Sequence, residues 1–164
     1  MNEHSVTALL DAARNIMEKA GLCFLITAGE SGAINARLMQ PFGPEEELVL
    51  WFGASAASRK VQELARDGRA TVVYQLPAEA AYVTLLGRAT VERDVAQRQR
   101  YWRESFTAFW PDGPAHEDYV VLRFVAERIE LMHIDQGIAP EPFGLRPAVL
   151  VKEAGTWRLA PGYP

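Results

Sequence analysis

The chain has 164 residues, of which 49% are hydrophobic and 23% charged, and its formal net charge at pH 7 is −4. This length fits one domain of about 100–200 residues with a core of its own, so we expect a single domain over residues 1–164. The acidic balance argues against binding along a nucleic-acid backbone, which requires a large surplus of Lys and Arg.

The first part of the chain predicts a helix followed by a β-hairpin. Apolar residues recur at helical spacing over 6–20, and Gly21 is a natural end for this amphipathic helix. Residues 22–28 are rich in strand formers, residues 29–32 have turn chemistry, and 33–39 begin with alternating apolar and polar residues. These segments therefore predict two antiparallel strands.

Predicted strands alternate with helices in the middle of the chain. A strand over 47–52 follows a proline-containing loop, and a helix over 56–67 begins with a basic cluster. Two further strands cover 70–76 and 81–91. Gly87 in the second of these strands indicates a bulge or a bend, as in strands that close barrels.

The last part predicts one more helix and several strands. Asp94 caps a helix that is expected to continue to about Phe109. Residues 119–124 and 129–134 have strand patterns, and the prolines and glycines of 135–147 predict an irregular segment.

Residues 148–152 and 156–159 predict a final hairpin. Together the patterns give about seven strands and three helices, with no internal repeat and no boundary between two domains. Runs of strands separated by helices favour an α+β fold, mainly β, built as an antiparallel barrel.

The sequence shows no sign of export or membrane insertion. Its apolar stretches are far shorter than the ~20 residues that cross a bilayer. Residues 1–4 lack the basic start and the apolar core of a signal peptide. We therefore expect a cytoplasmic protein with no membrane partner.

The reactive residue types give little support for a metal site or a nucleophile. Cys23, the single cysteine, lies in an apolar run and is expected to be a buried, inert thiol. His4, His116 and His133 have no Cys or carboxylate at ligand spacing, so we expect no metal. Neither a dinucleotide fingerprint nor a nucleophile elbow occurs.

Two side-chain clusters are expected to be structural. The carboxylates of residues 45–47 lie in a loop and predict a solvated charge run. Five aromatic residues at helical spacing predict packing in the core or against a second subunit rather than a ligand cage. These five are Tyr101, Trp102, Phe106, Phe109 and Trp110.

The most informative stretch, residues 50–60, is a strand that leads through small residues into a helix with a basic first turn. Exposed N–H groups and the dipole at a helix start favour an anion, and Ser58, Arg59 and Lys60 add one hydroxyl and two cations. Alternatively, Ser55 or Ser58 only caps the helix and both cations face solvent. The spacing alone leaves both interpretations open.

The order of the motifs resembles the pyridoxamine-phosphate-oxidase-like FMN-binding split barrel over most of the chain. The resemblance is carried by Ser58-Arg59-Lys60 after an aromatic strand, with Arg37-Leu38-Met39 upstream and Gln75 downstream. Residues 101–124 resemble the general-stress-protein branch of that family. This resemblance implies a six- to seven-stranded antiparallel split β-barrel with flanking helices.

The resemblance also implies a site for the phosphate of FMN. Ser58, Arg59 and Lys60 match positions that contact the phosphate, and Arg37 matches one that contacts the phosphate or the ribityl chain. Arg37 could instead be an ordinary surface residue of a strand.

Other matched positions concern the isoalloxazine ring. Leu38 and Met39 are implied to present their backbone to the ring, although Met39 could be plain core. Gly53 and Ala54 match positions that line the ring or ribityl region, where members often carry a hydroxylated or aromatic pair. Gln75 matches an amide that reaches the flavin from the partner subunit of a homodimer, unless it is only an outward polar residue.

The resemblance implies a flavoprotein, and it leaves the activity open. One reading is an FMN-dependent oxidoreductase that acts on a small substrate, with NAD(P)H as a candidate reductant, in which the flavin supplies the redox chemistry. Another is a non-catalytic carrier, sensor or stress-response protein. A weaker alternative is a split barrel that binds heme or a deazaflavin. No catalytic side chain is identified.

Overall fold

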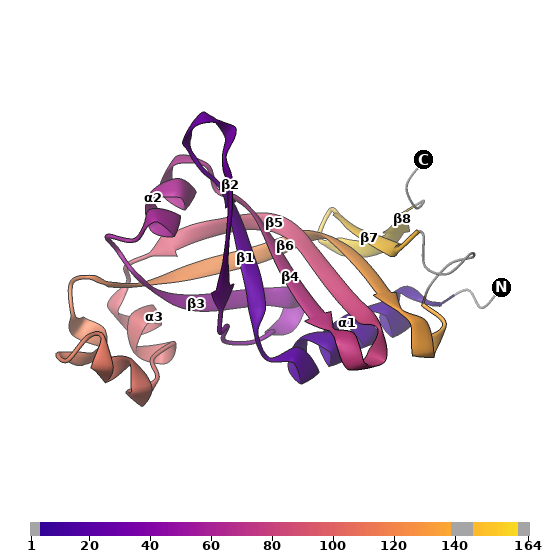
Figure 1. Cartoon of the computed structure of the whole chain (residues 1–164), viewed down its shortest axis with the longest axis horizontal. Helices are drawn as coiled ribbons and strands as arrows, with labels where there is room; N and C mark the ends of the chain where they lie inside the picture. Colours follow the sequence, from indigo (N-terminus) through magenta and orange to yellow (C-terminus); the bar gives the residue numbers. More distant parts are fainter. Residues whose placement is uncertain (1–3, 139–145, 161–164) are drawn as a thin grey trace.

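The computed structural model describes residues 4–138 and 146–160, and within them the chain forms one antiparallel sheet of eight strands with three α-helices (Figure 1). The α+β, mainly antiparallel fold is confirmed, with eight strands instead of six or seven. The elements are α1 (Val6–Ala20), β1 (Cys23–Ala28), β2 (Ile34–Met39), β3 (Val49–Ser55), α2 (Arg59–Arg66), β4 (Arg69–Leu76), β5 (Ala81–Glu92), α3 (Val95–Arg100), β6 (Tyr119–His133), β7 (Ala148–Glu153) and β8 (Thr156–Ala160).

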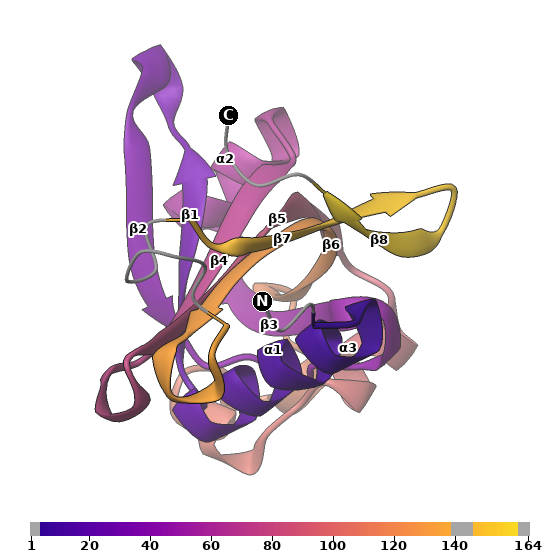
Figure 2. The same cartoon turned by 90° about the vertical axis from the view of Figure 1, so that its right-hand side faces the viewer.

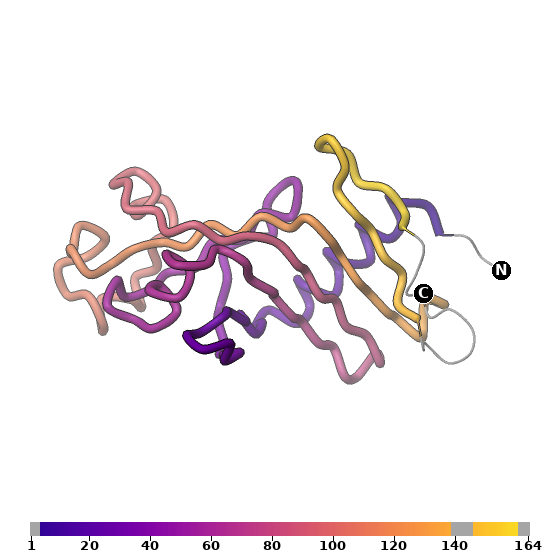
Figure 3. The backbone as a smooth tube through the Cα atoms, turned by 90° about the horizontal axis from the view of Figure 1, so that it is seen from above, coloured from indigo at the N-terminus to yellow at the C-terminus, as the bar shows by residue number. Residues whose placement is uncertain are grey.

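The strand order is β2-β1-β4-β5-β6-β7-β8, and β3 pairs with β6 outside this path. β5 and β6 run along the length of the molecule, with the segment after α3 at one end and the β7–β8 hairpin at the other (Figure 3). The predicted final hairpin is thereby confirmed.

The opening helix α1 matches its prediction at both ends. The side chain of Ser5 caps it by accepting a hydrogen bond from the N–H of Ala8 at 3.2 Å. Its buried residues, among them Ile16 and Met17, pack against β4 and β5, and Figure 2 shows the helix lying along the sheet. None of the helices in residues 4–138 and 146–160 is long and apolar enough to span a membrane.

The predicted irregularity at Gly87 is confirmed. The register of β5 with β6 shifts between Leu86 and Gly87, and a Cβ on Gly87 would lie 2.0 Å from the carbonyl oxygen of Val125. The prediction of two strands over 119–134 is wrong, because β6 is continuous. At the register shift β6 carries one extra residue, Glu127, opposite Leu86 and Gly87, and this bulge interrupts the alternating burial pattern of β6.

The predicted helix from Asp94 to about Phe109 is shorter than expected. Asp94 caps α3 by accepting a hydrogen bond from the N–H of Gln97 at 3.1 Å, as predicted, but α3 ends at Arg100. Residues 104–108 form a separate 3₁₀ helix. The chain turns because Arg103 donates a 2.7 Å hydrogen bond to the carbonyl of Pro41 and lies 4.0 Å above the ring of Phe42.

Two further expectations need correction. α2 begins at Arg59 rather than at residue 56, because Ala56 and Ala57 donate their backbone N–H groups to Asp118 in a turn.

Glu45 is not part of a fully solvated charge run. It accepts hydrogen bonds from the hydroxyl of Tyr101 at 2.5 Å and from the indole of Trp51 at 3.3 Å. Residues 139–145 of the predicted irregular segment lie outside the described residues.

The core lies between α1 and the sheet and includes the fully buried Leu50, Phe52, Leu122 and Phe124. Cys23 belongs to this core with 1% exposure, and burial raises the pKa of its thiol to about 12, which confirms the expected inert thiol.

Candidate functional site

A cavity of about 850 Å³ lies between the end of β2, the end of β3, the start of α2 and the segment before β6. It is lined by Leu38, Met39, Gln40, Gly53, Ala54, Ser55, Lys60, Phe106, Ala108, Phe109, Trp110 and Asp118. The structure thus brings together five of the nine predicted site residues, from three separate parts of the sequence. Beyond β2, Phe42 forms an isolated bridge with Trp51, which joins the chain there to β3.

The start of α2 borders this cavity and carries two polar groups without partners. Ser58 has extended backbone angles at the N-cap position, yet its Oγ is buried and makes no hydrogen bond to any described residue. No carboxylate in residues 4–138 or 146–160 lies within ion-pair distance of the Lys60 ammonium. Burial and the nearby charge of Arg37 lower the pKa of Lys60. A buried hydroxyl beside an uncompensated cation suits an anionic ligand.

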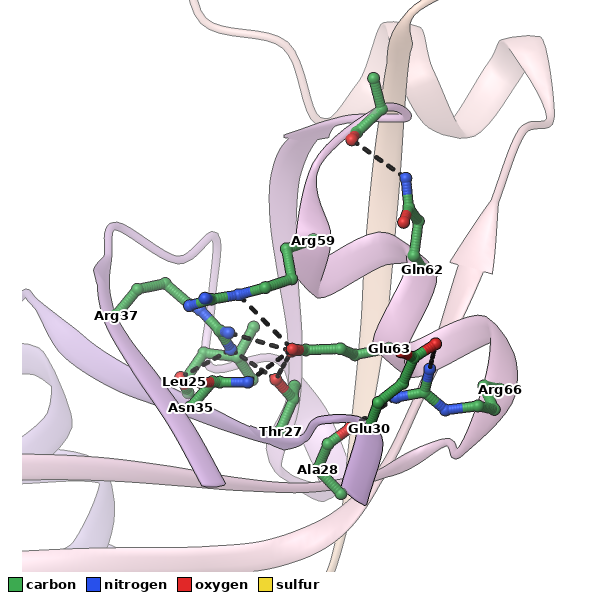
Figure 4. Close-up of polar contacts among 11 residues, drawn as sticks. Leu25, Thr27, Ala28, Glu30, Asn35, Arg37, Arg59, Gln62, Glu63 and Arg66 are labelled. Carbon is green, nitrogen blue, oxygen red and sulfur yellow. Dashed lines mark hydrogen bonds and ion pairs between the residues drawn. The ribbon is translucent and has the colours of Figure 1, made fainter. Parts of the chain in front are cut away.

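A buried carboxylate that the sequence did not reveal organises the other side of α2 (Figure 4). The side chain of Glu63 is 4% exposed and accepts hydrogen bonds from Thr27 Oγ1 at 2.5 Å and Asn35 Nδ2 at 2.6 Å. It also lies 3.1 Å from Arg37 Nη2 and 3.5 Å from Arg59 Nε. Burial opposes ionisation, but these hydrogen bonds and the charge of Arg37 outweigh it and lower the pKa of Glu63.

Arg37 is not an ordinary surface residue, because its guanidinium is fixed on the β1 side of β2. Nη1 donates to the carbonyl of Leu25 at 3.2 Å and to Thr27 Oγ1 at 2.7 Å, while Nη2 bonds to Glu63. The Arg37 side chain is 19% exposed. Its position beside Lys60 is therefore set by a closed network of three side chains.

Two predicted residues lie away from the large cavity. Arg59 is 69% exposed and lines a smaller cavity of about 230 Å³ together with Glu30, Asn35, Gln62, Glu63 and Arg66. Gln75 lies exposed on the outer face of β4, directly opposite Tyr82 of β5. Neither side chain is among those that line the 850 Å³ cavity.

Gly53 makes room for an aromatic ring. A Cβ at this position would lie 2.8 Å from Phe106 Cε2 and 3.1 Å from Tyr119 Cε2. The ring of Phe106 therefore covers β3 at a position where the family that the sequence resembles often carries a hydroxylated or aromatic side chain. Ala54, the next residue, is 2% exposed and packs into the core.

The aromatic cluster divides between the core and the cavity. Tyr101 is 5% exposed and stacks on Trp51 with ring centroids 4.3 Å apart, so packing is confirmed for this residue. Phe106 and Trp110 also line the cavity wall. Phe109 lies outside the core, with 73% exposure at the cavity.

Asp118 fixes one end of this wall. Its carboxylate accepts hydrogen bonds from Ser55 Oγ at 2.9 Å, from the N–H of Ala57 at 3.1 Å and from the indole of Trp110 at 3.2 Å. The bond from Ser55 is the largest cause that lowers the pKa of Asp118, and those from Trp110 and Ala57 add to it. Asp118 is thus an ionised, fully engaged carboxylate that orients Trp110.

The comparison with family models identifies the chain. Residues 10–135 match the model described as pyridoxamine 5'-phosphate oxidase like. The chain belongs to the pyridoxamine 5'-phosphate oxidase-like family. The resemblance stated from the sequence motifs is therefore confirmed. No curated protein matches this chain.

Solved structures similar to this chain agree with its fold. A Clostridium acetobutylicum protein related to general stress protein 26 has a TM-score of 0.69 at 21% identity, covering 76% of this chain and 88% of that one. A Nostoc punctiforme pyridoxamine 5'-phosphate oxidase-related, FMN-binding protein has a TM-score of 0.68 at 14% identity, covering 100% of both chains.

PhzG from Burkholderia lata, in complex with tetrahydrophenazine-1-carboxylic acid, has a TM-score of 0.71 to this chain at 15% identity. The match covers 97% of this chain and 92% of PhzG. At such identities these likenesses concern the fold, and they confirm the expected split barrel.

Proposed function

We propose that the chain binds FMN in the 850 Å³ cavity and uses it as an oxidoreductase toward a small substrate. The observation that carries this proposal is the pair formed by Ser58 and Lys60 at the start of α2, a buried hydroxyl and a cation that have no partner among the described residues. A phosphate monoester there would accept from both side chains and from free N–H groups of the helix start. Such a helix end favours a dianion.

The flavin ring would lie along the end of β2. This strand is at the end of the sheet path, so one edge of its backbone has no strand partner among the described residues. Backbone N–H and C=O groups near Leu38 and Met39 are then available to the polar edge of the ring. Gly53 and Ala54 of β3 would form the other side, with Phe106 as the aromatic cover. The flavin supplies the redox chemistry, and the protein binds and orients it.

A second copy of the chain would complete the site. Phe24, Ile34 and Leu38 lie on one face of the β1–β2 hairpin with 40%, 72% and 58% exposure, which is a large apolar surface for a monomer. Gln75 lies on the outer face of β4 and remains the proposed contribution of a partner subunit to the flavin.

A non-catalytic flavoprotein is the second candidate, and one observation favours it. Lys60 and Asp118 are the titratable side chains in the lining of the cavity. Asp118 is fully engaged by three donors, and Lys60 is assigned to the phosphate. Neither is then free to act as a general acid or base.

Two measurements, made one after the other, test the proposed function. A protein purified without added cofactor is expected to be yellow or to take up FMN, with the absorbance bands of a bound oxidised flavin. A colourless protein that cannot be reconstituted with FMN rejects both candidates. Anaerobic stopped-flow mixing with NADH or NADPH then separates them, because a flavin that is never bleached rejects the nicotinamide-linked oxidoreductase.

A further inference from the structure

Four charged side chains gather around the start of α2, and we call them the α2 charge cluster: Arg37, Arg59, Lys60 and Glu63. They come from β2 and α2. The single acid of the cluster is also its most buried member, with 4% exposure against 69% for Arg59. The nearby pair of Arg66 and Glu30, 3.0 Å apart, is exposed.

Glu63 does not point into the 850 Å³ cavity, yet it determines where one cation of that region lies. Arg37 has two of its three nitrogens engaged, with Nη1 on Leu25 and Thr27 and Nη2 on Glu63. Thr27 in turn donates to Glu63, which closes the network. A guanidinium held at both terminal nitrogens presents its remaining N–H groups in one fixed direction.

Without this network, nothing in the described residues would hold Arg37 beside Lys60. The two cations repel each other, and this repulsion adds to the larger effect of burial in lowering the pKa of Lys60. A free arginine side chain on an end strand would turn toward water. The negative charge of Glu63 therefore offsets the repulsion between Arg37 and Lys60. Without Glu63, only the anionic ligand would offset it.

We propose that Glu63 is a positioning residue for the cofactor: it holds the Arg37 guanidinium beside Lys60, ready for the phosphate of FMN. This inference rests on the proposed FMN site. It assigns Glu63 no contact with the cofactor, so its effect on binding must pass through Arg37.

Glu63→Gln is the conservative variant that keeps the geometry. The Gln Oε1 atom can accept from Thr27 and Arg37 in place of the carboxylate. Its Nε2 group can donate to Asn35 once the Asn35 amide rotates to present its oxygen. Glu63→Ala removes the acceptor of Arg37 Nη2 and leaves only the bonds of Nη1 to Leu25 and Thr27. Glu30→Gln is the matched control, because it removes an acid from the same region that is 84% exposed and bonds Arg66.

The test is a titration of FMN and riboflavin into each variant, followed by flavin fluorescence. We expect Glu63→Ala to weaken FMN binding about tenfold or more and to leave riboflavin binding unchanged. Glu63→Gln and Glu30→Gln should bind FMN at least as tightly as the wild type. In the Arg37→Ala background, Glu63→Ala should produce no further weakening, since the residue that it positions is gone.

Other outcomes overturn the proposal. Additive losses from Arg37→Ala and Glu63→Ala, or a Glu63→Gln variant as weak as Glu63→Ala, would mean that Glu63 does not act by holding Arg37. A purely structural role predicts equal losses for FMN and riboflavin. If Glu63→Ala does not fold, Thr27→Val removes the side-chain partner of Arg37 Nη1, and its effect on FMN binding is compared with and without Arg37→Ala in the same way. A wild type that binds no flavin would instead reject the FMN site itself.

Discussion

The carboxylate of Glu63 lies 3.1 Å from the guanidinium of Arg37, and this pair ties α2 to the β1–β2 hairpin. The two side chains are 4% and 19% exposed, so the pair is largely shielded from water. Such a pair contributes little net stability compared with an apolar contact, but removing one partner leaves a buried charge uncompensated.

Replacing Glu63 by Ala should therefore lower the free energy of unfolding by about 3–5 kcal/mol. Arg37, Thr27 and Asn35 would all lose the acceptor that they share. Urea denaturation followed by circular dichroism measures the change. Glu30→Ala, which breaks the exposed pair with Arg66, should cost only about 0–1 kcal/mol. Equal losses for both variants would contradict a buried role for Glu63.

The stability of the protein should depend on the ionisation of Glu63 in acid. Because the pKa of Glu63 is lowered in the folded state, its contribution is fully present above the ordinary value of 4.5. It is lost as the pH falls through the lower, folded-state pKa. We expect the stability difference between wild type and Glu63→Gln to shrink as the pH falls below about 4.5. A difference that is constant with pH would show that this carboxylate does not titrate with folding.

The space above Gly53 is expected to be intolerant of a side chain. Gly53→Ala brings a Cβ within 2.8 Å of Phe106 Cε2 and should destabilise the fold by about 1–3 kcal/mol. The smaller side chain of Leu in the double variant Gly53→Ala/Phe106→Leu should recover part of the loss, as measured by thermal melts. If the stability losses of Gly53→Ala and Phe106→Leu simply add in the double variant, the close packing of these two residues is contradicted.

The apolar face of the β1–β2 hairpin should join two copies of the chain. Phe24→Asp places a charge on this face and is expected to give a monomer with reduced FMN affinity. Val95→Asp is the control, because Val95 is 50% exposed on α3, away from that hairpin. Light scattering measures the mass. A wild type that is monomeric at full flavin occupancy would rule out the two-chain site.

Much of the fold was predictable because local patterns and the final packing agree. The opening helix has an N-cap, an apolar stripe and a terminal glycine, and its bounds at Val6 and Ala20 are confirmed. The segment after Asp94 was predicted less well. Its aromatic residues follow helical spacing, but Arg103 bonds to the β2–β3 loop and turns the chain into a 3₁₀ segment. Such tertiary contacts leave no periodic signal in the sequence.

The candidate site was predictable in part. The sequence placed Lys60 and Ser58 at a helix start, and the structure adds that neither side chain has a partner within residues 4–138 and 146–160. Glu63 was missed because an i,i+4 pair with Arg59 is usual on an exposed helix face. Its burial depends on Thr27 and Asn35 from the neighbouring hairpin, which only the folded chain brings to it.

The FMN affinity of two single variants, Lys60→Ala and Arg59→Ala, tests the central claim most directly. Lys60 lines the large cavity and has no counter-ion in the described part of the chain, whereas Arg59 is 69% exposed and lies against Glu63. Lys60→Ala should weaken FMN binding by about 1.5–3 kcal/mol, or roughly tenfold to a hundredfold, the usual worth of a charge-assisted hydrogen bond. Arg59→Ala should change it by less than about threefold. Unchanged affinity in Lys60→Ala would contradict the phosphate site.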